Sequence, residues 1–263
     1  MMQAASTAKM ALLAQQTRMD TIANNLANVN TAGFKTRSVT FKDMLYTTMR
    51  RQEGEQTVNL QKGTGVKVGS TDLSMYQGIP EMTGATLDFF IDGDAMFMVR
   101  EPNTGETYYT RNGAFMVSLE NDGAERYIVT AQGYYLLDEN GERINIPEDG
   151  KTEQVRVSMD GTLYIVGDDG ESAGFAQVGR RWFNNPYGLY SEGNTMFSVS
   201  ESSGEAVAAR VDVKLLQGYI EASNTDTSVE MVNLIKTQRA YSFASRAITT
   251  ADEMDAIANN MRT

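Results

Sequence analysis

The sequence predicts an α+β fold, with long N- and C-terminal helices that carry coiled-coil-like side-chain spacing and a central region that is all-β. Two observations predict the helices. Residues 2–29 and 227–262 contain neither Gly nor Pro, and each segment carries apolar or small side chains at alternating spacings of four and three. The third observation is a series of Gly-containing turns between short apolar runs over residues 84–213, which is typical of β-strands.

The N-terminal helix is predicted from one stripe of side chains. Alternating spacing of four and three places all of its members on the same side of a helix. Asn28, Asn30 and Gly33 then supply signals for the end of the helix. The segment 24–30 contains four Asn, which lower helix propensity, so interactions beyond propensity must hold it. The stripe consists of Met1, Ala5, Ala8, Leu12, Gln15, Met19, Ile22, Leu26 and Val29.

The C-terminal helix carries a stripe that is mostly alanine. Thr227 and Glu230 fit a capping box, with Thr227 as the cap and Glu230 reaching back to it. Small side chains allow close helix approach but bury little area each, so this stripe favours an assembly of many helices over an isolated pair. The alternative is that both helices pack on their own β domain. The stripe consists of Ala240, Ala244, Ala247, Ala251, Met254, Ala258 and Met261.

The region between the helices is punctuated by turn signals. Asp92-Gly93, Asn112-Gly113, Asn140-Gly141 and Asp160-Gly161 separate apolar or aromatic runs, and a short strand is expected at 66–68. We therefore expect four parts along the chain. These are an N-terminal helix and loop at 1–35, a connecting extended segment at 36–83, a central all-β domain at 84–213, and a C-terminal helix at 214–263 that pairs with the first part.

Composition excludes several classes of function. The chain contains no Cys and no His, which removes thiolate nucleophiles, Cys/His zinc sites and histidine acid–base chemistry. A net charge of −11 argues against a nucleic-acid surface, and no apolar run is long enough for membrane insertion. The phosphate-loop, dinucleotide and calcium-loop patterns each lack a required residue, so no cofactor, metal or catalytic residue is expected. Paired carboxylates leave open a β-rich carbohydrate-binding module or glycosidase with a helical oligomerisation stalk.

Two terminal motifs carry a family resemblance. The segment 22–35, IANNLANVNTAGFK, resembles the N-terminal signature of the bacterial flagellar rod and hook axial proteins. The segment 230–241, EMVNLIKTQRAY, resembles the C-terminal signature of the same family. Matching motifs at 87–94, 109–115 and 185–189 lie between them in the expected order. Within the family the chain is most similar to the distal-rod members, and the proximal-rod members are the alternative.

The resemblance implies a structural subunit that is not an enzyme and that polymerises into a helical tube transmitting torque from motor to hook. It also implies that the terminal helices form a coiled-coil-like inner layer of the tube and that the central all-β region is its outer domain. It implies contacts with copies of itself, with other rod and hook proteins, with surrounding ring proteins, with a rod cap, and with the flagellar type III export apparatus. The location implied is the basal body, reached without a cleaved signal peptide, and residues 1–6 show no signal pattern.

The terminal helices are expected to supply the assembly interface. Asn24, Asn25 and Asn28 are hypothesised to hydrogen-bond between neighbouring subunits, because buried amides need partners. The full expected interface consists of Ala8, Leu12, Met19, Ile22, Asn24, Asn25, Leu26, Asn28, Val29, Gln238, Arg239, Ala240, Tyr241, Ala244, Ala247, Ala251, Met254, Ala258 and Met261.

Overall fold

A computed structural model of the chain describes residues 2–48, 61–120, 125–147, 152–167, 172–209 and 213–261. The chain forms two compact units. The helical unit contains Met1–Ala27, Arg37–Ser74 and Thr225–Thr263, and the β-rich unit contains Asn28–Thr36 and Met75–Asn224. Helices near both termini and a large β-rich region between them confirm the α+β class.

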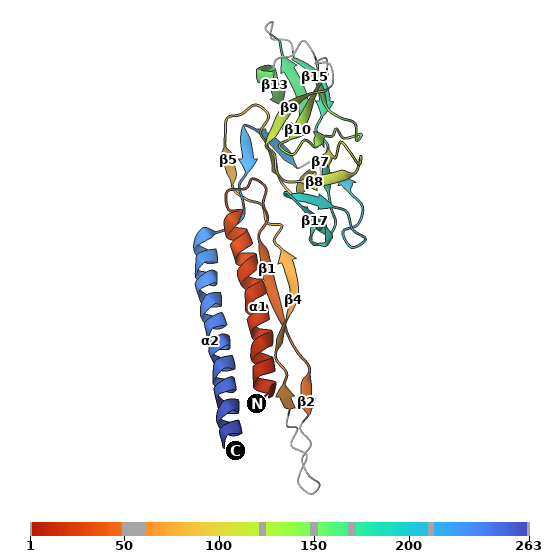
Figure 1. Cartoon of the computed structure of the whole chain (residues 1–263). Helices are drawn as coiled ribbons and strands as arrows, with labels where there is room; N and C mark the ends of the chain where they lie inside the picture. The colour runs from red at the N-terminus through yellow and green to blue at the C-terminus, as the bar shows by residue number, and fades with distance from the viewer. Residues whose placement is uncertain are drawn as a thin grey trace. The chain divides into compact units, whose positions relative to one another are not determined.

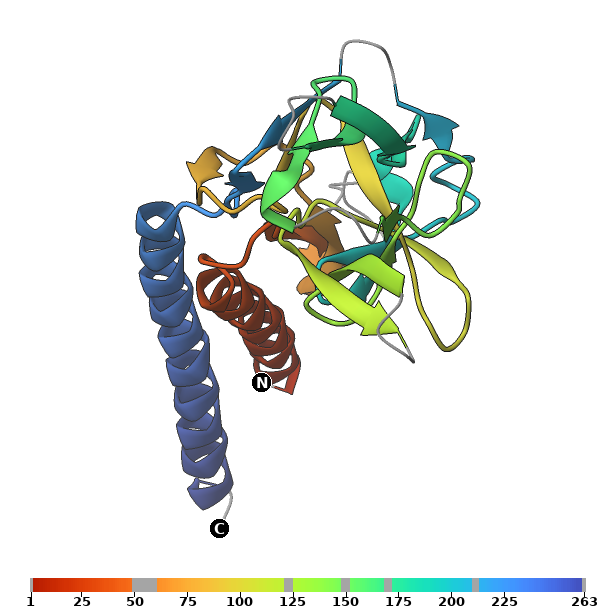
Figure 2. The ribbon, with the colours of Figure 1, turned by 90° about the horizontal axis from the view of Figure 1, so that it is seen from above.

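The helical unit is built from two antiparallel helices and a ladder of two strands. Helix α1 (Met2–Ala27) and helix α2 (Thr227–Asn260) lie side by side, with the N- and C-termini at the same end (Figures 1 and 2). Strand β1 (Arg37–Asp43) pairs with β4 (Val66–Leu73), and both pack on α1, which therefore lies between α2 and this ladder (Figure 1). Strands β2 (Tyr46–Thr48) and β3 (Gln61–Gly63) pair beyond it, and the strand expected at 66–68 is the start of β4.

The β-rich unit contains one large antiparallel sheet with the order β12-β10-β11-β7-β8-β18-β17, to which β9 adds at β10, β16 at β7 and β19 at β16. Strands β13-β14-β15 form a second sheet, and the pairs β20-β6 and β21-β5 complete the unit. The bounds are β5 (Pro80–Met82), β6 (Phe89–Asp92), β7 (Ala95–Arg100), β8 (Thr107–Thr110), β9 (Phe115–Glu120), β10 (Glu125–Thr130), β11 (Tyr135–Leu136), β12 (Asn145–Ile146), β13 (Val155–Val157), β14 (Thr162–Val166), β15 (Ser172–Gln177), β16 (Arg180–Trp182), β17 (Tyr190–Gly193), β18 (Met196–Ser198), β19 (Val207–Ala208), β20 (Lys214–Gln217) and β21 (Tyr219–Glu221), with short 3₁₀ turns at Thr152–Gln154 and Pro186–Gly188.

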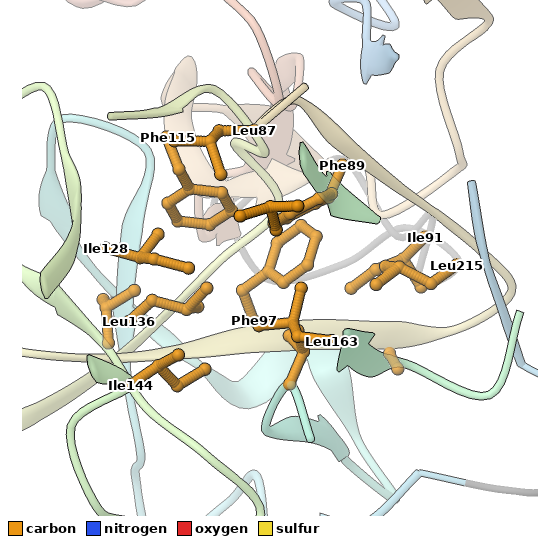
Figure 3. Close-up of a cluster of buried hydrophobic side chains, with 14 of the residues drawn as sticks. Leu87, Phe89, Ile91, Phe97, Phe115, Ile128, Leu136, Ile144, Leu163 and Leu215 are labelled. Carbon is orange, nitrogen blue, oxygen red and sulfur yellow. The ribbon is translucent and has the colours of Figure 1, made fainter. Parts of the chain in front are cut away.

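A single cluster of apolar side chains forms the core of the β-rich unit (Figure 3). Phe97 lies near its centre and packs edge-on against Phe115, with ring centroids 5.2 Å apart. Every residue from 95 to 99 in β7 is buried, so both faces of that strand are covered. Burial of this kind supplies the main stabilisation of the unit, at about 25 cal/mol per Å² of apolar area.

The predicted Gly turns fall between consecutive strands. Gly141 and Gly161 have φ of 84° and 85°, a conformation that favours glycine because it has no Cβ. Gly113 is required for a different reason. A Cβ at this position would lie 1.7 Å from the carbonyl oxygen of Phe89, whose amide donates to the Gly113 carbonyl at 3.0 Å. This glycine therefore allows two backbone segments to approach each other.

Candidate assembly interface

Helix α2 begins after Asp226, which caps its N-terminus. The Asp226 side chain accepts hydrogen bonds from the amides of Ser228 at 2.8 Å and Val229 at 3.2 Å, as N-cap residues do. The predicted cap at Thr227 is therefore wrong by one residue. Glu230 does not reach back to the cap as expected, because its Oε1 accepts a hydrogen bond from Asn25 Nδ2 at 3.1 Å.

Asn25 connects three segments of the helical unit. Its side chain is fully buried, its Nδ2 donates to the Arg37 carbonyl at 2.8 Å, and its Oδ1 accepts from the Arg37 amide at 3.0 Å. The same amide bonds Glu230, so Asn25 joins the end of α1 to the start of β1 and to α2. The hypothesis that Asn25 bonds a neighbouring subunit is wrong, because its amide is buried and bonded within the chain.

Asn28 belongs to the β-rich unit, not to α1. Its Oδ1 accepts a hydrogen bond from the Thr31 hydroxyl at 3.2 Å, and the Thr31 amide donates to the Asn28 carbonyl at 3.1 Å. Asn28 and Val29 are both half-buried in this turn after the helix, whereas Asn24 is exposed on α1. The three predicted Asn residues therefore have three different environments.

The facing sides of α1 and α2 contain many of the predicted stripe residues. Thr237, which was not predicted, is 1% exposed on the same side of α2 as Ala251, and its hydroxyl bonds the Asn233 carbonyl within the helix. Small residues along α2 therefore allow α1 to pack closely. Among the predicted residues, Ala8, Ile22 and Ala251 are buried, and Leu12, Met19, Leu26, Ala240, Ala244 and Ala258 are half-buried.

The remaining predicted residues of α2 are exposed. A strict heptad stripe drifts by about 20° per heptad on a straight helix of 3.6 residues per turn. Between Ala240 and Met261 this amounts to about 60° over three heptads, which turns Ala247, Met254 and Met261 away from α1 while Ala251 and Ala258 stay at least partly covered. The exposed residues are Gln238, Arg239, Tyr241, Ala247, Met254 and Met261.

A second side of α2 is both apolar and basic. Phe243 is 70% exposed there, between Arg239 and Arg246, and these three residues help to line a hollow of about 500 Å³. Exposed apolar surface of this kind marks an interaction site in soluble proteins. Sequence reasoning missed this side because it followed one stripe per helix, although the spacings of four and three repeat here as well. We call it the outer face of α2, formed by Val232, Arg239, Phe243, Arg246, Ile257 and Met261.

The β-rich unit contains a buried ionic cluster around Glu221. The Glu221 carboxylate accepts hydrogen bonds from Lys35 Nζ at 2.5 Å, from the Gly78 amide at 2.8 Å and from Arg111 Nη1 at 3.3 Å. Lys35 Nζ also donates to the Tyr76 carbonyl at 2.8 Å. All three charged side chains are buried, so the cluster links β21 to the turn after α1 and to two loops of the unit.

Burial dominates the electrostatics of this cluster. It lowers the pKa of Lys35 below 10.5, and the attraction of Glu221 opposes that shift without cancelling it. Burial likewise lowers the pKa of Arg111, again against the attraction of Glu221. Both oxygens of the Glu221 carboxylate accept hydrogen bonds from buried donors, so the cluster has a structural role. Lys35 and Glu221 are separated by 186 residues, and no local sequence signal announces their pairing.

Two features are not found in the described parts of the chain. No group of three or more acidic residues there is arranged to hold a metal ion. Among the same residues, neither helix has an apolar stretch long enough to cross a membrane.

Comparison with known proteins identifies the family. The model described as "Flagella basal body rod protein" matches residues 6–35, the FlgE/F/G hook D1 domain model matches 90–165, and the model of the C-terminal part of the FlgEFG rod proteins matches 216–261. These matches include the turn after α1, the core strands of the β-rich unit and α2.

Full-length relatives agree with these models. The flagellar basal-body rod protein FlgG of Borreliella burgdorferi is 35% identical, covering 100% of this chain and 99% of that protein. FlgG of Bacillus subtilis is 37% identical over 91% of each chain, and the hook-basal body complex protein FlhP of the same organism is 32% identical over 100% of each.

A crystal structure of the Helicobacter pylori hook protein FlgE2 covers 63% of this chain and 47% of that one, at 13% identity and a TM-score of 0.24, which is too low to support an argument. The family models and the relatives identify this chain as a member of the flagellar basal-body rod protein family.

Proposed function

We propose that this chain is the distal-rod subunit of the bacterial flagellum, polymerising into a helical tube that transmits torque from motor to hook. The supporting observation is the exposed outer face of α2, which α1 leaves uncovered in a single molecule. An exposed apolar helix face marks an interaction site, and in a polymer a helix of each neighbouring copy covers it. The family is one of structural rod proteins, not of enzymes.

In this polymer the terminal helices form a coiled-coil-like inner layer, and the β-rich region is its outer part. The half-buried side chains between α1 and α2 support this arrangement, because they are covered only in part within one chain. The division into parts 1–35, 36–83, 84–213 and 214–263 belongs to the same proposal. The assembly role of the predicted interface residues other than Asn25 is also part of this proposal.

The partners that this proposal gives the chain are copies of itself, other rod and hook proteins, surrounding ring proteins and a rod cap. Export through the flagellar type III apparatus without a cleaved signal, to the basal body, completes the proposal. A proximal-rod role is the alternative within the family, and the full-length match to FlhP keeps a second hook-basal body role open. Neither the family models nor the relatives named above support the carbohydrate-binding or glycosidase alternative.

Two experiments test the function. Electron microscopy of the purified chain under polymerising conditions should show tubes, and a chain that stays monomeric at every concentration would refute the polymer. Immunogold labelling of basal bodies from the bacterium that encodes the chain should then place it on the rod segment next to the hook. Label confined to the segment next to the motor would favour the proximal-rod alternative.

A further inference from the structure

Charges on α2 are separated into two bands. Lys236, Arg239 and Arg246 lie in a segment without acidic residues, and Asp252, Glu253 and Asp255 follow in a segment without basic residues up to 261. Ion pairs within a helix form at spacings of three or four, and no acid in α2 stands at either spacing from these three bases. Within the described residues, none of the six charged side chains forms an ion pair.

Asp252 projects from a different side of the helix than the basic band, whereas Glu253, seven residues beyond Arg246, lies on the same side as the bases. The basic band belongs to the outer face, where Phe243 stands between Arg239 and Arg246 beside the hollow. Asp252 lies nine residues beyond Phe243, which is about two and a half turns at 3.6 residues per turn, so it points to the opposite side. Spacings of four, three and four place small side chains beside Asp252. We call this the small-residue face, formed by Ser245, Thr249, Asp252 and Ala256.

Neither face is covered by α1 in a single molecule. Helix α1 packs against the side of α2 that contains Thr237 and Ala251. On the other two sides, Phe243, Asp252 and Ala256 are all exposed. One face therefore offers large apolar side chains and positive charge, and the other offers small side chains and negative charge.

We propose that the outer face of α2 binds the small-residue face of α2 in a second copy of this chain, with Arg246 opposite Asp252. Phe243 then packs over the small side chains around Thr249. This inference rests on the proposed polymer and specifies the contact that builds it. Because the two faces differ, the contact is head-to-tail and does not close on itself, which is the condition for a filament.

The charge positions also set the axial offset between copies that lie parallel. Pairing Arg246 with Asp252 shifts one helix by six residues, or about 9 Å at 1.5 Å per residue. The same shift places Phe243 opposite Thr249 and Arg239 opposite Ser245. The contact therefore fixes the register along the tube as well as the identity of the partner.

The exposed side of α1 fits the basic band less well. It carries one acid, Asp20, and the other charges of the helix are Lys9 and Arg18. A single acid flanked by bases does not match the separated charges of α2. The favoured occupant is therefore α2 of a second copy.

Charge reversal tests the contact. The variant Arg246→Glu and the variant Asp252→Lys should each raise the critical concentration for polymerisation by about tenfold. The chain that combines both substitutions should return close to the wild-type value, because opposite charges again face each other. Circular dichroism should show unchanged helix content in every variant, since the substituted side chains are exposed.

The outcomes separate this inference from the proposed function. Wild-type tubes together with unimpaired assembly of both reversed variants would overturn the α2 contact and leave the polymer standing. Impaired assembly that the combined variant does not restore would also overturn it. A wild-type chain that never polymerises would refute both.

Disulfide cross-linking provides an independent measurement, because the chain contains no native Cys. Residues 246 and 252 lie about 9 Å apart along one helix, beyond the reach of an internal disulfide. Oxidised polymers of Arg246→Cys/Asp252→Cys should therefore yield covalent ladders longer than dimers, while each single-Cys variant should yield dimers at most. Ladders that form instead with Arg246→Cys/Asp20→Cys would identify α1 as the occupant and contradict the inference.

Discussion

Glu221 is the one buried anion of the ionic cluster in the β-rich unit, and its charge is tested by Glu221→Gln. Glutamine keeps nearly the same shape and can still accept a hydrogen bond from the Gly78 amide. It leaves Lys35 and Arg111 buried beside each other without the carboxylate that both contact. Removing one partner of a buried ion pair costs about 3–5 kcal/mol, and we expect a loss of unfolding free energy in that range.

The single Trp182 provides the measurement, because it lies in β16 of the same unit. Urea denaturation followed by its fluorescence gives the unfolding free energy of wild type and variant. The matched control is Glu81→Gln on β5, where the carboxylate is exposed and the expected change is within about 0.5 kcal/mol. A second variant, Lys35→Met/Glu221→Gln, should recover part of the loss, because it removes one of the two uncompensated cations.

The size of the loss decides the interpretation. A decrease below about 1 kcal/mol for Glu221→Gln would refute the reasoning, because such a value is typical of an exposed ion pair. A double variant that is no more stable than Glu221→Gln would show that the uncompensated Lys35 charge is not the cause of the loss.

Three further predictions concern the helical unit and the protonation of Lys35. Asn25→Ala removes the three hydrogen bonds of a buried side chain and should lower the unfolding free energy by about 2–4 kcal/mol, measured from the loss of helical circular dichroism. An unchanged unfolding transition would contradict the assignment. Phe243→Ala should change the unfolding free energy by no more than about 0.5 kcal/mol yet impair polymerisation. The control Tyr190→Ala, an exposed residue of the β-rich unit, should affect neither. Equal polymerisation of the two variants would contradict the role of the outer face. The pKa of Lys35 is lowered on folding, so the unfolded chain binds more protons than the folded chain between that pKa and 10.5. The unfolding free energy of wild type, measured by urea denaturation, should therefore rise with pH relative to that of Lys35→Met. Parallel pH profiles of the two proteins would contradict this.

Much of the helical framework could be predicted from local sequence. Helices expected at 2–29 and 227–262 are observed as Met2–Ala27 and Thr227–Asn260, because the absence of Gly and Pro and the choice of helix-forming residues act within a few turns. The observed N-cap is Asp226, one residue before the predicted Thr227, because Asp and Thr are both good caps and only the backbone geometry selects between them.

The site depended more on the tertiary structure. The alanine stripe of α2 indicated a helix–helix contact, but which of its members face α1 depends on how a straight helix departs from a heptad repeat. Asn25 could be singled out in the sequence because it is a polar residue in a segment of low helix propensity. Its partners Arg37 and Glu230 could not be predicted, because they come from β1 and α2.

The sequence by itself determined the two helices, the β-rich middle and the family, because propensity, turn chemistry and motifs are encoded over short stretches of chain. Only the tertiary structure decided which sides of α2 remain uncovered and that Lys35 meets Glu221 and Arg111. The physical reason is that burial and ion pairing depend on which distant segments pack together, and no local pattern records the partner.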